Sequence, residues 1–351
     1  MDLALLGWDS FFADAFTEHR ARGWEPARVA TEDKHHYTVV GEAGDVIAVI
    51  AGKLHHTRGS NTALPKVGDW VAVARQPGEA KAVIHAVLPR RTTLTRKTTG
   101  REVRAQVLAT NIDLAFIVAA LDETFNLRRL ERFLVMVHEG GARPVVVLNK
   151  ADLCADVEAR HAGARQAVGD TPIVIVSAKT RKGIGQLNEF IRPGSTVVFI
   201  GTSGVGKSSL INRLNGEATQ PTLEVRASDA KGRHATTWRE LIPLPNGGLV
   251  IDTPGMREFH MWVAGEGLDE AFPDLLALSA SCKFRDCAHQ DEPACAVKTA
   301  VAAGHVPRDR YQSFLKLQRE LSFMAEECKQ HTYTVNKRRA QMGTKAWLRK
   351  D

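Results

Sequence analysis

A glycine-rich loop between an apolar segment and a helical stretch constrains the fold of this chain more than any other feature. The apolar segment covers residues 197–200, and the helical stretch is Lys207–Leu214. The loop and the first residues of the helical stretch read Gly201-Thr202-Ser203-Gly204-Val205-Gly206-Lys207-Ser208-Ser209. This segment contains the motif G-x-x-x-x-G-K-[ST]. Glycines allow such a loop to wrap phosphate groups with backbone N–H groups, and the helix N-terminus adds a positive dipole. We expect these nine residues to hold nucleotide phosphates, with Lys207 on the β- and γ-phosphates and Ser208 on Mg²⁺.

Strands and helices alternate from about residue 106 to residue 255. Five segments are almost wholly apolar, at residues 114–118, 145–148, 173–176, 197–200 and 249–251. Helical stretches such as Leu127–Glu139 lie between several of them. Strands without polar alternation are buried on both faces, so the pattern predicts a parallel sheet with helices on both sides. Sheets of this kind bind ligands at the carboxyl ends of their strands.

One predicted strand ends in Asp252-Thr253-Pro254-Gly255. A carboxylate at the tip of a parallel strand can complete the ligand shell of Mg²⁺. Because glycine has no side chain, the backbone N–H of Gly255 can come close to a γ-phosphate. By itself the segment could be an ordinary turn, but beside a phosphate loop it predicts a segment that senses the nucleotide.

Two further strand ends predict which base is bound. Residues 145–148 run into Asn149-Lys150-Ala151-Asp152, and residues 173–176 run into Ser177-Ala178-Lys179. A carboxylate at Asp152 can accept hydrogen bonds from N1–H and the exocyclic amine of guanine, whereas adenine would oppose it with a lone pair at a cost of about 1–3 kcal/mol or more. The Ser177-Ala178-Lys179 backbone could contact the guanine carbonyl oxygen, so these residues favour GTP over ATP.

The order of these motifs is unusual. They resemble the motifs of the GTPase family, in which the phosphate loop comes first and the guanine motifs come last. In this chain the guanine motifs precede the phosphate loop, which resembles the circularly permuted GTPases. As a result, residues 252–255 lead directly into the C-terminal region, so a shift that depends on the γ-phosphate would act on that region.

Three of the five cysteines lie within fourteen residues of the C-terminal third. With one histidine they form the pattern C-x₄-C-x-H-x₅-C, made by Cys282, Cys287, His289 and Cys295. Three thiolates and one imidazole close a tetrahedral structural Zn²⁺ site without an open position for catalysis. An odd number of cysteines in a cytosolic chain argues against a disulfide framework.

The rest of the chain divides into further regions. From about residue 35 to 90, short alternating segments at residues 37–40, 45–51, 69–75 and 81–88 predict a small antiparallel barrel like the OB-fold. The predicted organisation is an N-terminal extension (1–34), an OB-like barrel (35–92), a central α/β domain with circularly permuted P-loop GTPase motifs (93–258), and a mostly helical zinc-binding domain with a basic tail (259–351). In the last of these, an apolar stripe predicts a helix over residues 308–324.

The charge and hydropathy of the chain limit the kinds of partner that this protein is expected to have. The chain has 351 residues with 47 Lys and Arg against 40 Asp and Glu, which gives a net charge of +7. The basic residues are concentrated in residues 90–104 and in the last 21 residues, and such clusters attract phosphate backbones of nucleic acid. The longest apolar run has eight residues, too few to cross a membrane. Without a signal sequence, a cytoplasmic protein is expected.

The combination of barrel, permuted GTPase motifs and C-x₄-C-x-H-x₅-C module resembles the RsgA family of bacterial GTPases that depend on the small ribosomal subunit, also called YjeQ or EngC. The blocks at residues 67–71, 232–234 and 252–259 also resemble this family. The resemblance implies a monomeric late checkpoint in small-subunit assembly, together with other assembly factors. The GTP form would bind rRNA of the immature particle, the subunit would stimulate hydrolysis, and the GDP form would leave.

Hydrolysis is expected to be slow without a partner. Where Ras-like enzymes have a glutamine that orients the attacking water, this chain has Met256. His234 is the best candidate to position water because imidazole both accepts and donates hydrogen bonds, although it could instead contact RNA. Thr237, or alternatively Thr236, is expected to bind Mg²⁺ and the γ-phosphate, and Gly255 completes the predicted catalytic set.

Other functions are less consistent with the sequence. A non-catalytic RNA-binding assembly factor could use GTP as a structural ligand, but it would not need a complete set of base and phosphate motifs. A P-loop kinase or ATPase would share the phosphate loop, yet Asp152 disfavours adenine. The permuted motif order argues against a translational GTPase.

Overall fold

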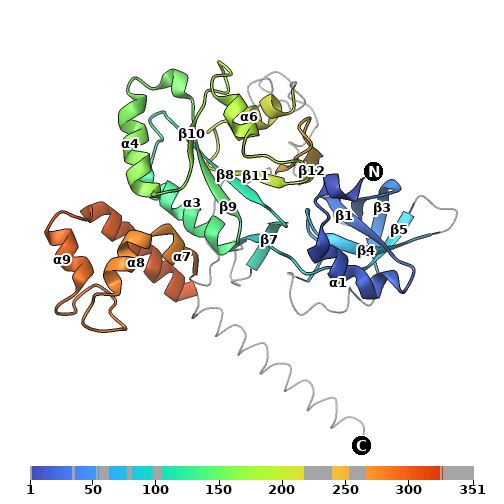
Figure 1. Cartoon of the computed structure of the whole chain (residues 1–351), viewed down its shortest axis with the longest axis horizontal. Coiled ribbons are helices and arrows are strands. Elements are labelled where there is room, and N and C mark those ends of the chain that lie inside the picture. Colours follow the sequence, from blue (N-terminus) through green and yellow to red (C-terminus); the bar gives the residue numbers. More distant parts are fainter. Residues whose placement is uncertain are drawn as a thin grey trace, which may run out of the picture.

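Five strands near the N-terminus close into a barrel in the computed structural model (Figure 1). The structure describes residues 2–33, 36–52, 54, 63–76, 81–97, 105–216, 239–252, 266–324 and 326. The barrel strands are β1 (Glu25–Glu32), β2 (Tyr37–Gly41), β3 (Gly44–Ile50), β4 (Trp70–Arg75) and β5 (Lys81–Val87). They pair in the order β1-β2-β3-β5-β4, and β4 returns to β1. All of these pairs are antiparallel except β3–β5, and the predicted OB-like barrel is confirmed.

The barrel begins earlier than the sequence predicted. Its first strand, β1, lies within residues 1–34, which were expected to be an extension, and it pairs with both β2 and β4. The sequence of β1 carries Pro26, Arg28 and a glutamate at each end, so it lacks the apolar alternation that marks the other strands. Tertiary contacts rather than local pattern therefore make this segment a strand.

Arg28 explains why a polar residue occupies the middle of β1. Its side chain is 1% exposed and donates hydrogen bonds to the backbone carbonyl oxygens of Leu6, Gly68 and Asn111. Burial lowers the pKa of Arg28 to about 10, and the nearby carboxylates Asp113 and Asp69 oppose that shift. One buried cation thus joins the N-terminal residues, the barrel and the segment that enters the central domain.

The N-terminal residues cover one end of the barrel. They form a short 3₁₀ helix, η1 (Leu3–Leu6), and helix α1 (Ser10–Arg20). The rings of Phe12 and Trp8 lie 5.8 and 4.6 Å from the ring of the buried Trp70 on β4. Phe16 is also fully buried, so the aromatic side chains of this segment pack on the barrel.

A two-stranded hairpin connects the barrel to the central domain. Its strands are β6 (Thr93–Lys97) and β7 (Ala105–Thr110), which pair antiparallel. The sequence showed here only a cluster of basic residues, because Arg96 and Lys97 interrupt the apolar pattern of β6. Part of the predicted basic run is therefore a strand, while residues 98–104 lie outside the described part of the chain.

The central domain is an α/β sheet in the order β10-β9-β8-β11-β13-β12. The first five strands are parallel: β8 (Leu114–Ala120), β9 (Arg143–Asn149), β10 (Ile173–Ile175), β11 (Thr196–Ile200) and β13 (Leu249–Asp252). Their positions confirm the five apolar segments predicted from the sequence. The sixth strand, β12 (Glu240–Pro243), which the sequence did not reveal, runs antiparallel to β13.

Helices cover both faces of this sheet, as predicted. On one face, Ala115 and Ile117 of β8 pack in a cluster with α3 (Leu127–Glu139) and α4 (Val157–Val168). On the other face, Leu114 and Phe116 pack in a second cluster with α5 (Ile184–Asn188) and α6 (Lys207–Leu214). Alternate residues of one strand thus enter different cores, which explains why the strand is apolar throughout.

The barrel and the α/β sheet are continuous. Strand β12 pairs with β1 at Thr31 and Glu240, so the sheet continues from the central domain into the barrel. Next to this pair, Oε2 of Glu32 lies 3.9 Å from Nη1 of Arg239. Glu32 also forms an ion pair with Lys66.

The C-terminal region is helical, as Figure 1 shows at the lower left. It contains α7 (Glu266–Ala271), α8 (Pro273–Ser279), α9 (Ala296–Ala302) and a helix over residues 308–324. The last of these confirms the predicted helix. Helix α7 packs closely on α3, where a side chain at Gly267 would overlap the backbone of Glu139 and Val135. Among the described residues, no helix is long and apolar enough to cross a membrane.

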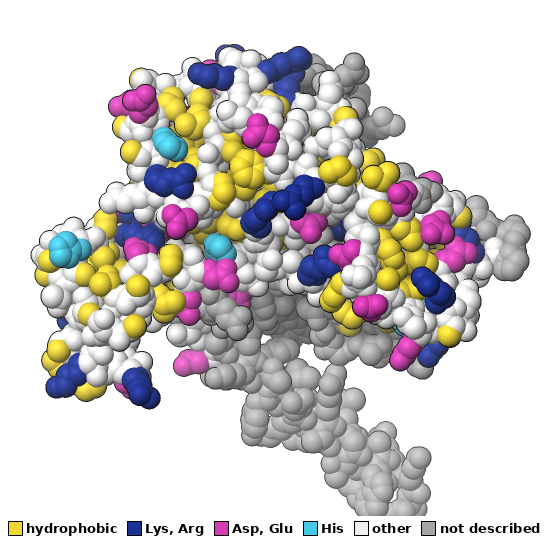
Figure 2. Space-filling model, viewed as in Figure 1, with side chains coloured by type: hydrophobic (Ala, Val, Ile, Leu, Met, Phe, Trp, Pro, Cys, Tyr) yellow, Lys and Arg dark blue, Asp and Glu magenta, His cyan; other side chains and the backbone are white. Residues whose placement is uncertain are grey.

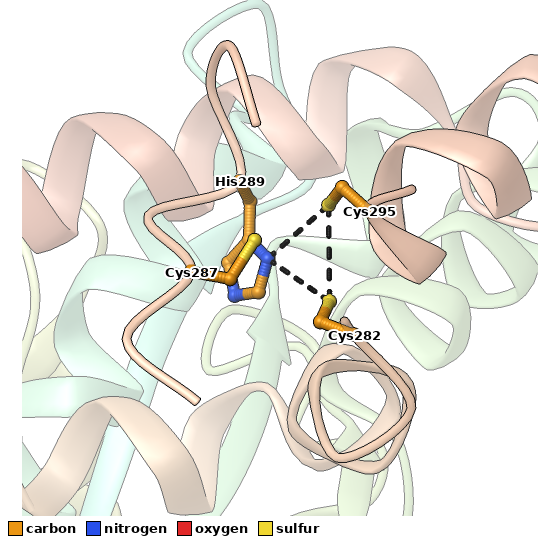
Figure 3. Close-up of side chains that lie close together, drawn as sticks. All are labelled: Cys282, Cys287, His289 and Cys295. Atoms are coloured by element: carbon orange, nitrogen blue, oxygen red, sulfur yellow. Dashed lines mark hydrogen bonds between the residues drawn. The ribbon is translucent and has the colours of Figure 1, made fainter. Parts of the chain in front are cut away.

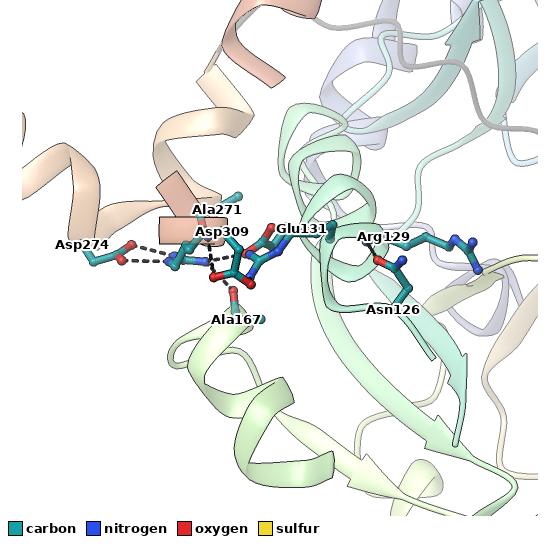
Figure 4. A network of polar contacts seen from close by, with 9 residues as sticks. Asn126, Arg129, Glu131, Ala167, Ala271, Asp274 and Asp309 are labelled. Carbon is teal, nitrogen blue, oxygen red and sulfur yellow. Dashed lines mark hydrogen bonds and ion pairs between the residues drawn. The ribbon is translucent and has the colours of Figure 1, made fainter. Parts of the chain in front are cut away.

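Polar contacts hold this region on the central domain (Figure 4). Arg310 is 4% exposed and donates two hydrogen bonds to Asp274, at 2.8 and 2.6 Å. It also donates to the fully buried Glu131 of α3 at 3.1 Å and to the carbonyl oxygen of Ala167 in α4 at 2.7 Å. One guanidinium therefore connects α8, α3 and α4.

Candidate nucleotide site and metal centre

The phosphate loop lies between β11 and α6. Gly201, Gly204 and Gly206 have φ angles of 149°, 80° and 97°, which favour glycine. A side chain on Gly201 would also collide with the carbonyl oxygen of Val118 on β8. At the start of α6, Lys207 Nζ donates to the carbonyl oxygens of Gly201 and Thr202, both at 2.8 Å. The lysine ammonium is thus held over the loop whose backbone depends on these glycines.

Asn149 joins three of the predicted segments. It ends β9 and is 1% exposed. Its Nδ2 donates to the carbonyl oxygen of Val205 in the phosphate loop at 2.8 Å, and its Oδ1 accepts from the backbone N–H of Ala178 at 3.0 Å. Any side chain at Gly206 would collide with Asn149 Nδ2. The structure therefore brings Asn149, Ala178 and the phosphate loop together.

Asp152 lies at the surface beside Ser177. Ser177 Oγ donates to Asp152 Oδ1 at 2.5 Å and accepts from the backbone N–H of Thr180 at 3.1 Å. This hydrogen bond from Ser177 is the main reason that the pKa of Asp152 lies below its ordinary value. The carboxylate is therefore ionised at neutral pH and fixed next to the buried serine, where it can accept hydrogen bonds from a planar base with two adjacent N–H groups.

The remaining described residues of the predicted site lie at the same edge of the sheet. Asp252 ends β13, which is parallel to β11, and it is half-buried. Lys179 is exposed on the loop that follows β10. Along the phosphate loop and the start of α6, Ser203 and Ser208 are exposed, while Thr202 and Ser209 are half-buried. Because β9, β10, β11 and β13 are parallel, their carboxyl ends bring all these residues to one edge.

The predicted catalytic residues are not among the described ones. His234, Thr236 and Thr237, together with Gly255 and Met256, lie in residues 217–238 and 253–265, outside the described ranges. Their roles stay predictions.

Two residues of the site were not found from the sequence. Asp122 follows the end of β8 and accepts a hydrogen bond from Lys150 Nζ at 2.9 Å. Arg213 of α6 donates from Nε to the carbonyl oxygen of Ala178 at 3.0 Å. A carboxylate just beyond an apolar strand was a usable signal for Asp122, because it places the group at the ligand edge of the sheet. No sequence pattern points to Arg213.

The four residues of the cysteine and histidine pattern form one cluster (Figure 3). The ligand atoms of Cys282, Cys287, His289 and Cys295 all lie within 4.8 Å of one another. His289 Nδ1 lies 3.6 Å from Cys282 Sγ and 3.4 Å from Cys295 Sγ, and these two sulfurs are 3.8 Å apart. Three sulfurs and one imidazole nitrogen at such distances can hold one metal ion.

The backbone and its neighbours fix the geometry of this cluster. Cys295 precedes α9, and its sulfur accepts from the N–H of Lys298 at 3.5 Å. Burial raises the pKa of the Cys282 thiol, but backbone N–H groups of Val297 and Ala296 outweigh it, so the pKa lies below its ordinary value. The start of helix α9 therefore favours the thiolate of Cys282, whereas burial raises the pKa of the Cys287 thiol to about 11.

Glu292 and Tyr311 support the loop that carries His289. The two carboxylate oxygens of Glu292 accept from the N–H groups of Ala288 and Gln290, each at 2.8 Å. Tyr311 donates from its hydroxyl to the carbonyl oxygen of His289. These contacts hold the imidazole, which is 5% exposed, in the cluster.

The fold and site together define a circularly permuted P-loop GTPase, because the segment with Asn149 and Asp152 precedes the phosphate loop in the chain and adjoins it in space. Residues 87–262 match the model of the RsgA GTPase family. The chain belongs to this family and is a GTPase.

Relatives over most of the chain agree with this assignment. A protein of Opitutus terrae, named small ribosomal subunit biogenesis GTPase RsgA, is 47% identical over 93% of this chain and 91% of its own length. A protein of Syntrophotalea carbinolica with the same name is 42% identical over 92% and 90%.

Two solved structures share the architecture. YjeQ from Thermotoga maritima aligns with a TM-score of 0.64 and 29% identity, over 85% of this chain and 98% of that one. YloQ, described as a circularly permuted GTPase, aligns with a TM-score of 0.60 and 26% identity, over 85% and 95%. The circular permutation predicted from motif order is confirmed by this likeness.

Proposed function

We propose that this GTPase acts in biogenesis of the small ribosomal subunit, as a late assembly checkpoint that binds rRNA and is stimulated by the subunit. The observation that carries the nucleotide part is the junction at Asn149, which ties the phosphate loop to the loop beside Asp152. Support for the ribosomal part comes from the names of the relatives. Work on ribosomal subunits implies a cytoplasmic location.

Each residue of the proposed nucleotide site has a chemical task. Asp152 reads the N1–H and exocyclic amine of guanine, and the loop of Ser177, Ala178 and Lys179 lies beside the base. Backbone N–H groups of residues 201–206 and the Lys207 ammonium bind the phosphates. The oxygens of Ser208 and Asp252 hold Mg²⁺, and Thr202, Ser203 and Ser209 line the phosphate end.

The base preference can be tested with one substitution. In Asp152→Asn, the amide keeps an acceptor for N1–H but turns the second acceptor into a donor, which matches the C2 carbonyl of xanthine instead of the amine of guanine. We expect the variant to lose GTP turnover and to gain turnover of xanthosine triphosphate. Unchanged GTP affinity in the variant would contradict the assignment of Asp152.

We propose zinc as the ion of the Cys282, Cys287, His289 and Cys295 cluster. With bonds of about 2.3 Å to sulfur and about 2.0–2.1 Å to nitrogen, a regular tetrahedron has edges of about 3.8 Å between sulfurs and about 3.6 Å between sulfur and nitrogen. The corresponding distances among Cys282, His289 and Cys295 are 3.8 Å and 3.4–3.6 Å, and Cys287 lies within 4.8 Å of each of them. Metal analysis of the purified chain should find about one zinc per molecule.

The proposal that this protein binds RNA rests on its N-terminal barrel and on its excess of basic residues. Five-stranded OB-like barrels are a common platform for nucleic acids. On the face seen in Figure 2, Lys and Arg side chains lie over all three regions and are mixed with acidic ones. Of the two predicted basic clusters, residues 90–97 are described, whereas residues 98–104 and the last 21 residues lie outside the described part of the chain, so contact of those two segments with RNA is proposed from sequence alone.

The decisive experiment measures GTP turnover by the full chain alone, with purified small subunits and with large subunits. We expect slow turnover alone and stimulation of about tenfold or more by small subunits only. His234→Ala should abolish the stimulated rate while leaving GTP affinity intact. Equal rates in all three conditions would contradict the proposal, and a subunit that binds without faster turnover would favour GTP as a structural ligand.

A further inference from the structure

We propose that Asp122 is a positioning residue of the nucleotide site, which sets the place of Lys150 and thereby the affinity for guanine nucleotides. This proposal rests on the proposed nucleotide site and extends it to a residue outside the GTPase motifs. Asp122 lies two residues beyond the end of β8, and Lys150 directly follows Asn149 at the end of the neighbouring parallel strand β9. Lys150 Nζ donates to Asp122 Oδ2 at 2.9 Å.

Asp122 is itself fixed by its own turn. Its Oδ1 accepts from the backbone N–H of Thr124 at 2.9 Å and from Thr124 Oγ1 at 2.6 Å. One carboxylate oxygen thus bonds to the turn and the other bonds to Lys150. The hydrogen bond from Thr124 is the largest of several causes that lower the pKa of Asp122 to about 2, so the carboxylate stays charged at any pH at which the protein works.

Lys150 also has an uncommon backbone conformation. Its φ angle of 63° lies in the left-handed region, which is uncommon for a residue with a side chain. The residue stands between Asn149, which is tied to the phosphate loop, and Asp152, which faces the base in the proposed site. Lys150 therefore connects, along the chain, the residue tied to the phosphate loop and the loop proposed to read the base, and its ammonium is held at Asp122.

The energetic effect is expected on binding rather than on the chemical step. Lys150 and Asp122 are about 30% and 24% exposed, so the pair is partly screened. Releasing Lys150 would leave a mobile cation with several rotamers, which binding must then order. Neither residue lies at the phosphate loop or at Asp252, so the γ-phosphate end of the site is unchanged.

The test compares Asp122→Ala and Lys150→Ala with the double variant in the full-length chain. Affinity for GDP and GTP is measured by fluorescence titration, and turnover is measured at saturating GTP. We expect Asp122→Ala to raise Kd for both nucleotides and KM for GTP by about twofold to fivefold, with kcat unchanged. The double variant should bind no more weakly than Lys150→Ala, because both changes remove one interaction.

Glu123→Gln is the matched control. Glu123 is exposed and adjacent, so its replacement removes the same charge from the same turn without removing the contact with Lys150. Asp122→Asn, which keeps an acceptor for Lys150, should have an intermediate Kd. Thermal unfolding without nucleotide separates a loss of folding from a loss of positioning.

Several outcomes would overturn the proposal. One is an unchanged Kd in Asp122→Ala, and another is an increase of Kd in Glu123→Gln as large as in Asp122→Ala. The others are a loss of kcat in Asp122→Ala as large as its rise in Kd, and a rise of Kd in the double variant equal to the two single effects combined. They differ from failure of the proposed nucleotide site, in which the unaltered chain itself would not prefer GDP over ADP.

Discussion

Replacing Arg310 with leucine is expected to loosen the C-terminal region from the central domain. Arg310 is 4% exposed and bonds at once to Asp274, to Glu131 and to the carbonyl oxygen of Ala167. Leucine fills much of the same space but leaves the fully buried Glu131 without this partner. Arg128 still contacts Glu131 from the solvent side, so the cost should lie near the lower end of the 3–5 kcal/mol typical for breaking a buried ion pair, at about 3 kcal/mol.

Hydrogen exchange is the suitable assay, because a chain of several regions does not unfold in one transition. Undocking exposes the helices over residues 266–279 and 308–324, whose amides should exchange about 100-fold faster if opening becomes about 3 kcal/mol easier. The double variant Arg310→Leu with Glu131→Leu should recover most of the protection, since two apolar side chains leave no buried charge.

Arg132 provides the control. It makes two hydrogen bonds to Glu320, at 2.7 and 2.9 Å, which also join α3 to the C-terminal helix. The two side chains are 28% and 35% exposed, so Arg132→Leu should cost no more than about 1 kcal/mol. If both variants exchange at the same rate, burial of the charge does not decide the strength of this docking and the reasoning is wrong.

Three more outcomes follow from the same structure. Gly206→Ala should weaken nucleotide binding at least tenfold, measured by GDP titration, because a left-handed backbone and a collision with Asn149 together cost about 2 kcal/mol or more; unchanged affinity would contradict this. Removing the metal with a chelator, or replacing the buried Cys295 with serine, should unfold the segment around α9 and speed its hydrogen exchange, whereas unaltered exchange would show that the cluster is not structural. Burial raises the pKa of Asp274, but the hydrogen bond and charge of Arg310 outweigh it and the net shift is downward. The stability this carboxylate contributes is therefore fully present above the unfolded value of about 3.9 and is lost as the pH falls through the lower folded value, so protection of α8 should be constant from pH 7 to about pH 5 and should decline below about pH 4; a decline near neutral pH would contradict the assignment.

The elements that the sequence predicted share one property, which is a strong local pattern. The five apolar strands of the central sheet were predicted because each is buried on both faces, and four barrel strands because they alternate. The strands β1, β6, β7 and β12 were not predicted. In β1, β6 and β12, charged residues or proline break the pattern, whereas β7 contains neither and was missed nonetheless. Contacts with distant strands, rather than local preference, make them strands.

For the site, the sequence alone determined which chemical groups are present. A short stretch of chain that must wrap a ligand needs its residues at a fixed spacing, so that spacing is visible in the sequence. This holds for Gly201, Gly206 and Lys207, and for Cys282 and its partners. Only the tertiary structure decided that Asn149 bonds to Val205 and Ala178, and that Asp122 holds Lys150. These contacts join residues 28–56 positions apart, and their partners follow from strand order and side-chain direction, which no local pattern records.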